Sequence, residues 1–122
     1  MPIRMLIDEN LRGPLWQAIQ RHNLMGGLPI DAVRVGDPAD LPLGSADDAV
    51  LAWCERESRI LIGLDHETLP RHLDDHLGSG RHCPGICLLR PGTSLRDILA
   101  ILEVVAHAGE PDDFRDQVKF LP

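Results

Sequence analysis

Five acidic residues stand where this sequence could build a reactive centre. Asp8 follows one short apolar run directly, and Asp65 and Glu67 follow another. Asp47 and Asp48 begin a segment with helical spacing. Carboxylates gathered within a few ångströms repel one another unless a cation lies between them. Oxygen ligands favour Mg²⁺ or Mn²⁺, and such an ion can activate water for attack on a phosphodiester.

Short apolar segments that alternate with amphipathic segments must position these acids. The pattern predicts strands over residues 3–7, 29–35, 59–63, 85–89 and 117–121. It predicts helices from Gly13-Pro14 to about residue 26, over residues 46–54 and 69–77, and after Ser94. Ser45 is expected to cap the second helix, with Asp48 in a capping-box-like position. Ser94 is expected to cap the last helix.

This alternation predicts one α/β domain over residues 1–122, a three-layer αβα sandwich with a central, mainly parallel sheet of about five strands. In such a sheet every loop from a strand to a helix lies at the carboxyl edge. Asp8, Asp48 and Asp65 should therefore meet there. Structural alternatives stay open, because Asp47 and Asp48 could simply oppose a helix dipole and Asp65 could cap the next helix.

Composition and charge limit the class of protein. Hydrophobic residues make up 43% of the 122-residue chain, aromatic residues make up 3%, and three cysteines form no disulfide framework. No apolar run reaches the roughly 20 residues of a membrane span, so we expect a cytoplasmic protein with Cys54 and Cys87 in its core. The net charge of -7 is unfavourable for binding a polyanion. A nucleic-acid binder would need bound cations or a local basic surface, for which the candidates are Arg12, Arg56, Arg71, Arg81 and His66.

The opening MLIDENL and the later segment DDAVLAWCERESRILIGLDHET also carry a resemblance to a known family. Across nearly its whole length the chain resembles the PIN-like family of small bacterial proteins, related to the VapC-type toxin ribonucleases. The resemblance places metal-binding acids at Asp8, Asp48 and Asp65 and a second acidic position at Glu67. Gly63 stands where that family commonly has Thr or Ser, and Thr68 stands where it usually has Phe.

The resemblance implies cleavage of single-stranded RNA that depends on Mg²⁺ or Mn²⁺. Asp8, Asp48 and Asp65 would be the catalytic metal ligands, with Glu67 as an outer ligand or water-positioning residue. We expect Asn10, Arg12 and His66 to bind the substrate. The resemblance also implies a homodimer and, for a toxin, a cognate antitoxin.

Two other functional classes compete with a nuclease. A receiver-like phosphoacceptor domain would also use the pair Asp8-Glu9 and Asp65, although it would require a hydroxyl residue after the fourth strand and a Lys after the fifth. Thr93 comes late for that role, and Lys119 lies within the last predicted strand. A catalytically silent PIN-like interaction module is the third hypothesis.

A histidine-rich segment, RHLDDH, could also supply metal ligands. His72 and His76 are four residues apart on a predicted helix and, with Asp75 or His82, could hold a transition metal. Such a segment is more often a solvated helix face, and we interpret it in that way.

Overall fold

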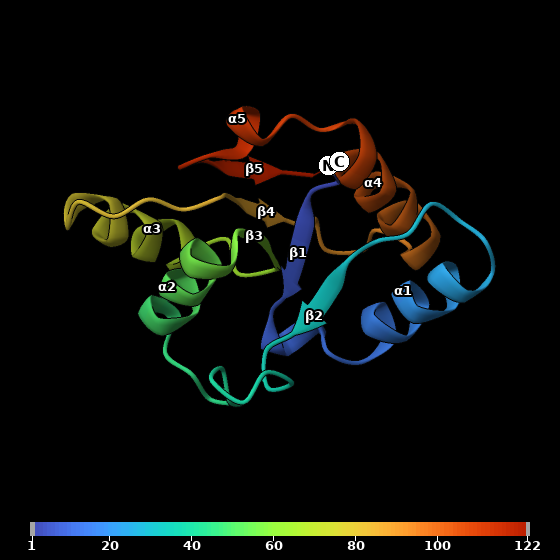
Figure 1. Ribbon diagram of the computed structural model, residues 1–122, viewed down its shortest axis with the longest axis horizontal. Coiled ribbons are helices and arrows are strands. Elements are labelled where there is room, and N and C mark those ends of the chain that lie inside the picture. Colours follow the sequence, from blue (N-terminus) through green and yellow to red (C-terminus); the bar gives the residue numbers. More distant parts are fainter. Residues whose placement is uncertain (1, 122) are drawn as a thin grey trace.

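The computed structural model describes residues 2–121. Five strands form one parallel sheet in the order β2-β1-β3-β4-β5 (Figure 1). The strands are β1 (Arg4–Ile7), β2 (Ala32–Arg34), β3 (Arg59–Gly63), β4 (Ile86–Leu88) and β5 (Val118–Phe120). The predicted α/β class with a central sheet of five strands is confirmed, and every strand pair is parallel.

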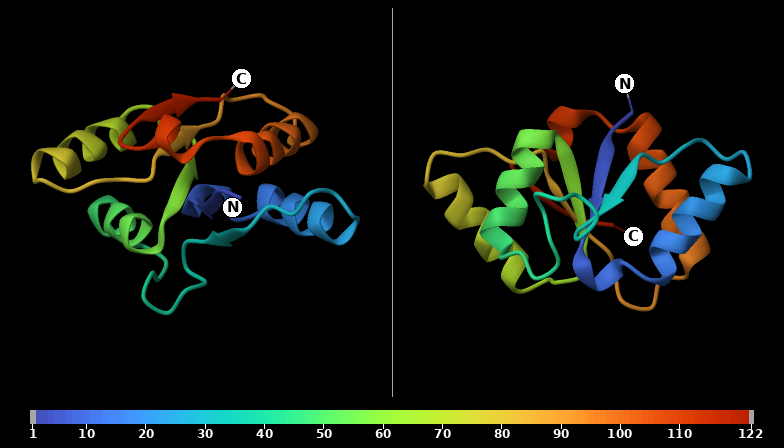
Figure 2. Two further views of the ribbon diagram at one scale, coloured as in Figure 1. Left: turned by 45° about the horizontal axis from the view of Figure 1, so that its top comes forward. Right: turned by 60° about the horizontal axis from the view of Figure 1, so that its bottom comes forward.

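Helices cover both faces of this sheet. The four longer helices are α1 (Pro14–Leu24), α2 (Asp47–Glu57), α3 (Thr68–Gly78) and α4 (Leu95–Ala108). Helices α1 and α4 lie side by side on one face, and α2 and α3 lie side by side on the other (Figures 1 and 2). Two short elements complete the order, the 3-10 turn η1 (Glu9–Leu11) and the helix α5 (Pro111–Phe114).

The central strands β1 and β3 are buried on both faces because each is a continuous aliphatic run. In β1, the side chains of Met5 and Ile7 pack in the layer under α1 and α4. The side chain of Leu6 between them packs in the layer under α2 and α3. Successive side chains of a strand point to opposite faces, so one short segment contributes to both cores. The end of β1 is thereby held firmly where Asp8 begins.

The structure corrects some predicted ends. Strand β2 begins at Ala32 instead of residue 29, because both backbone groups of Ile30 bond to the side-chain amide of Asn23. Ser45 is not the cap of α2: the N-cap residue is Ala46, and the Ser45 hydroxyl donates to the Pro42 carbonyl instead. Ser94 does cap α4, where its hydroxyl accepts from the Asp97 N–H at 3.2 Å.

Two further predictions concern burial and membrane insertion. Cys54 and Cys87 are buried in the core as predicted, and Cys83 is buried as well. Burial raises the pKa of the Cys87 thiol to about 12 and that of Cys83 to about 11. None of the helices in residues 2–121 has both the length and the apolar character that a membrane span requires.

Candidate functional site

Asp8 leaves the carboxyl end of β1 and is half-buried. Its backbone N–H donates to the Ile62 carbonyl at 3.0 Å, and its Oδ1 accepts from the Glu9 N–H at 2.8 Å. Gly63 lies against the same carboxylate: a Cβ placed on Gly63 would be 3.5 Å from Asp8 Oδ2 and 2.9 Å from Leu69 Cδ1. A hydroxyl residue at position 63 would therefore require the end of the Leu69 side chain, in the first turn of α3, to shift.

The electrostatic surroundings of Asp8 show which acids lie near it. Burial raises the pKa of Asp8 above its usual value, the hydrogen bond from the Glu9 N–H opposes that rise, and the charges of Asp47, Glu9 and Asp65 raise it further. Acids from the ends of β1 and β3 and from the start of α2 therefore converge at the carboxyl edge. We call Asp8, Asp47 and Asp65 the acidic centre.

Asp65 is held by the first residues of α3. Its Oδ1 accepts from the N–H groups of Glu67 and Thr68, both at 2.9 Å, and its Oδ2 accepts a short hydrogen bond from the Thr68 hydroxyl. The Thr68 hydroxyl is the main reason that the pKa of Asp65 is lowered. Thr68, at the position where the PIN-like resemblance predicts Phe, thus fixes the orientation of the Asp65 carboxylate. The side chain of Glu67 is exposed.

Asp47 and Asp48 stand in the first turn of α2, and they differ in exposure and in their contacts. The Oδ2 of Asp47 lies 3.1 Å from Nε2 of His72 on α3. Asp48 is exposed, its Oδ1 accepts from the Ala49 N–H at 2.9 Å, and it lines a hollow between α2 and α3 together with Asp75. Asp47, which the sequence analysis placed second to Asp48, is the one that acts on Asp8.

The expected substrate-binding residues lie on both sides of Asp8. Arg12 bonds to Asp37 beyond the end of β2, at 3.3 Å. On the other side, His66 Nε2 lies 2.9 Å from the Leu89 carbonyl beyond β4, and its ring is 5.2 Å from that of Phe120. Asn10 is exposed on η1. Together these residues span the carboxyl edge.

The candidate arginines do not gather into one basic surface. Arg12, Arg56 and Arg81 are each paired with a nearby acid, namely Asp37, Asp40 and Glu55. These ion pairs lie on different elements. Any attraction for a polyanion must therefore come from a smaller group of basic residues.

The donor type suits a hard divalent cation. The acidic centre offers only carboxylate oxygens. Burial first, and then the charges of nearby acids, raise the pKa of Asp8, and a bound cation would favour its ionised form. Within residues 2–121, no three His, Cys, Asp or Glu side chains are already spaced to hold a metal ion. Asp47 and Asp65 are engaged by His72 and Thr68, so their side chains would have to turn to complete a coordination shell.

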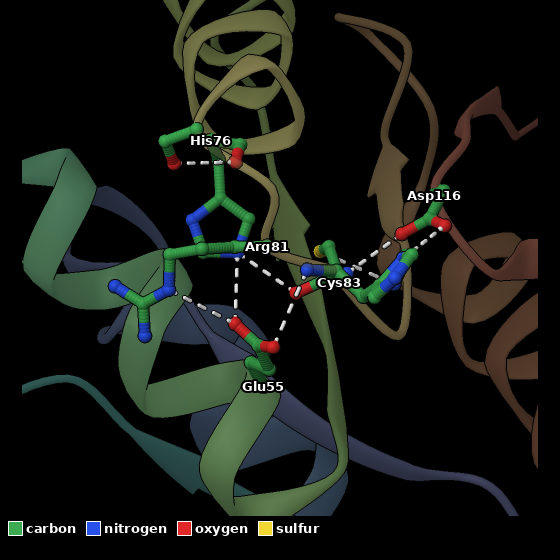
Figure 3. A network of polar contacts seen from close by, with 8 residues as sticks. Glu55, His76, Arg81, Cys83 and Asp116 are labelled. Carbon is green, nitrogen blue, oxygen red and sulfur yellow. Dashed lines mark hydrogen bonds and ion pairs between the residues drawn. The ribbon is translucent and has the colours of Figure 1, made fainter.

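A polar network that was not predicted from the sequence lies at the opposite, amino edge of the sheet (Figure 3). His76 is buried, with 6% of its surface exposed, so the prediction of a solvated face is wrong for this residue. Its Nε2 lies 2.8 Å from the His82 carbonyl and 3.1 Å from Glu55 Oε1. The burial of His76 could have been predicted from its spacing, because it continues the helical stripe of the buried residues Leu69 and Leu73.

Two carboxylates hold the segment between α3 and β4 in this network. Glu55 lies 3.3 Å from Arg81 Nε and accepts from the His82 N–H at 3.3 Å. Asp116 accepts from the Cys83 N–H at 2.8 Å and lies 2.9 Å from His82 Nδ1. A cavity of about 600 Å³ adjoins this edge, and no acid of the acidic centre lines it. The network therefore serves to join α2, α3, β4 and β5.

The acidic centre at the carboxyl edge is thus the arrangement with the clearest chemistry in the described part of the chain. Comparison with protein-family models, with curated proteins and with solved structures gave no match.

Proposed function

We propose that the protein is a PIN-like endoribonuclease that depends on Mg²⁺ or Mn²⁺ and cleaves single-stranded RNA at the acidic centre. One observation carries this proposal: half-buried Asp8 and Asp65 leave the adjacent parallel strands β1 and β3 at the carboxyl edge, where the charge of Asp47 also acts on Asp8. Asp8 and Asp65 follow β1 and β3, the adjacent strands from which the chain winds in opposite directions. Open α/β sheets bind ligands at such a point.

The chain's own residues have distinct tasks in this proposal. A bound divalent ion would supply an activated water and stabilise negative charge at phosphorus. Asp8, Asp47 and Asp65 would hold the ion, while the Thr68 hydroxyl and the Glu9 N–H orient two of these carboxylates. Exposed Glu67 would position water beside Asp65.

The first test is cleavage of an end-labelled single-stranded RNA by the purified protein. Cleavage should require Mn²⁺ or Mg²⁺ and stop when EDTA is added. Asp8→Asn keeps the acceptor for the Glu9 N–H but removes the charge, so we expect the cleavage rate to fall at least about 100-fold. Cleavage at the wild-type rate by a folded Asp8→Asn protein would refute the acidic centre as the catalytic site.

A matched pair of neighbouring variants tests which acid of α2 takes part. Asp47→Asn should lower the cleavage rate on the order of 100-fold, because the charge of Asp47 acts on Asp8. Asp48→Asn should change it less than about threefold, because an exposed carboxylate elsewhere on the surface has little effect on the ion. The reverse result would restore Asp48 as the ligand and reject the assignment of Asp47.

The strand order favours a second candidate. The order β2-β1-β3-β4-β5 is that of flavodoxin-like doubly wound domains, which include receiver domains, and Asp8 and Asp65 follow the appropriate strands. Against this candidate, Lys119 lies inside β5, and hydrogen bonds already occupy both oxygens of Asp65. Incubation with acetyl phosphate and Mg²⁺ separates the two, since a phosphoryl group on Asp65 supports the receiver. If RNA cleavage, phosphorylation and metal binding by calorimetry are all absent, the silent module is favoured.

A further inference from the structure

Two arginines share one carboxylate beside the acidic centre. Arg34, the last residue of β2, binds Asp37 through Nε at 2.7 Å and through Nη2 at 3.1 Å. Arg12, just after η1, binds the same carboxylate through Nη2 at 3.3 Å. Both guanidinium groups lower the pKa of Asp37, chiefly through the hydrogen bond from Arg34. Asp37 is therefore ionised, and the group keeps a net positive charge.

This surplus of positive charge sets the group apart from other ion pairs of the chain. Arg59 is matched by Asp31, Arg56 by Asp40 and Arg81 by Glu55. Arg12 also has an unused donor: its Nε is buried and has no hydrogen-bond partner in the described chain. Because that Nε is buried, a ligand reaches Arg12 through the exposed part of its side chain, which is 29% of the side-chain surface.

An aromatic ring lies behind the second arginine. The Arg34 guanidinium carbon is 4.7 Å from the centre of the Trp16 ring, so the planar group is supported on one side. The side chain of Arg34 stays 26% exposed, which leaves part of it accessible to a ligand. Trp16 lies in the first turns of α1, which also begins at the carboxyl edge. Arginine planes and aromatic rings are the surfaces on which unpaired bases stack.

We propose that Arg12 and Arg34 bind a phosphate of single-stranded RNA and that an adjacent base stacks on the Arg34–Trp16 pair. This inference rests on the proposed nuclease function, because the cluster lies at the same edge as Asp8. The exposed part of the Arg12 guanidinium would donate to a phosphate oxygen, and Arg34 would stay anchored by Asp37. The cluster thus gives an acidic protein a local positive site for its polyanionic substrate.

The test is a fluorescence-anisotropy titration of a labelled single-stranded RNA with Asp8→Asn protein, in which the RNA stays intact. Arg12→Gln and Arg34→Gln should each weaken binding at least about fivefold. Each should also reduce the slope of log affinity against log salt by about 0.7, the value for one phosphate contact on a single strand. Arg56→Gln removes the same charge from an exposed pair with Asp40 and should leave the affinity and the slope unchanged.

Lysine variants distinguish charge from planarity. Arg34→Lys should restore the salt slope but not the affinity, because an ammonium group keeps the charge and loses the stacking plane. If circular dichroism shows that a Gln variant is unfolded, the RNA affinity of the Lys variant at that position replaces it as the test of the subsite.

Cleavage and binding assays together distinguish an error in the RNA subsite from an error in the nuclease proposal. Wild-type cleavage of RNA, combined with Gln variants that bind like Arg56→Gln, would overturn the subsite and leave the nuclease intact. Binding that depends on Arg12 and Arg34, without any cleavage by wild-type protein, would support the subsite and reject the nuclease. Absence of RNA binding by the Asp8→Asn protein would overturn the subsite.

Discussion

Two features of its surroundings disfavour the ionised form of Asp8 when no metal ion is bound. Its position directly after a buried strand removes water from the carboxylate, and Asp47 and Asp65 add negative charge nearby. Both effects disfavour the ionised form. The hydrogen bond from the Glu9 N–H acts in the other direction and lowers its pKa. A residue of this kind reduces stability at neutral pH unless a cation is bound.

The first stability prediction concerns the pH dependence caused by Asp8. Its pKa is higher in the folded state than the value of 3.8 for an unperturbed Asp, so the folded state holds its proton more tightly. Stability from this group is complete below pH 3.8 and is lost as the pH rises through the folded-state pKa. Asp8→Asn should therefore raise the thermal midpoint at pH 7 by a few degrees, about 2–5 °C, and have little effect near pH 3.

Divalent cations supply the control for this prediction. Millimolar Mn²⁺ should raise the midpoint of the wild-type protein, since a ligand that binds only the folded state stabilises it. The Asp8→Asn variant should not respond. A variant that is less stable than the wild type at pH 7 would show that the carboxylate is well accommodated without a cation.

At the scale of elements, the starts of α2 and α4 show two ways to satisfy a helix end. Both N-cap residues are extended, with ψ near 152° at Ala46 and 153° at Ser94. Ser94 provides a side-chain acceptor, whereas α2 has Asp47 and Asp48 in its first turn, where acids oppose the helix dipole. The first turn of α2 is therefore stabilised without a capping hydroxyl. The same turn supplies Asp47 to the acidic centre.

Two serine variants test these different roles. Ser94→Ala removes the acceptor for the Asp97 N–H and should lower the free energy of unfolding by about 1 kcal/mol. Ser45→Ala should cost less than about 0.5 kcal/mol, because the Ser45 hydroxyl only donates to the Pro42 carbonyl in a loop. Urea denaturation of both variants measures the difference. Equal losses would mean that Ser45 supports α2 as strongly as Ser94 supports α4.

At the scale of the whole molecule, the groups of the proposed functional site and the polar network around His76 lie at opposite edges of the sheet. The carboxyl edge carries the acidic centre and the Arg12–Arg34 cluster. The amino edge carries the network around Glu55 and His76, which ties α2 to α3 and to the segment before β4 (Figure 3). Helix α2 also supplies Asp47 to the acidic centre, and α3 supplies the Thr68 hydroxyl that bonds to Asp65. The network therefore helps to set the relative position of these two residues from the opposite edge.

Replacing the buried histidine tests that stabilising role. His76→Ala would leave a cavity, an unbonded His82 carbonyl and a Glu55 carboxylate with fewer partners. We expect the free energy of unfolding to fall by about 2–4 kcal/mol. His72→Ala, one turn earlier on α3 and with 37% of its side chain exposed, should cost less than about 1 kcal/mol. Similar losses in urea denaturation would contradict a special role for His76.

Much of the fold was predictable from local patterns. The aliphatic runs before Asp8 and Asp65 and the stripe from Ile98 to Val105 are long enough to define their elements. The four-residue helix α5 was missed, because a single turn leaves no measurable period. The cap of α2 was misplaced by one residue, since only backbone geometry shows that Ala46 and not Ser45 is the last extended position.

The sequence by itself determined that acids end two central strands, because parallel strands present their carboxyl ends at one edge. It could not choose between Asp47 and Asp48, since successive helical residues point about 100° apart and only the packing of α2 against α3 selects one of them. The same holds for His76, whose partner Glu55 lies on α2, and for Arg12 and Arg34, which meet at Asp37 across two elements. Residues distant along the chain become partners only when the layers pack.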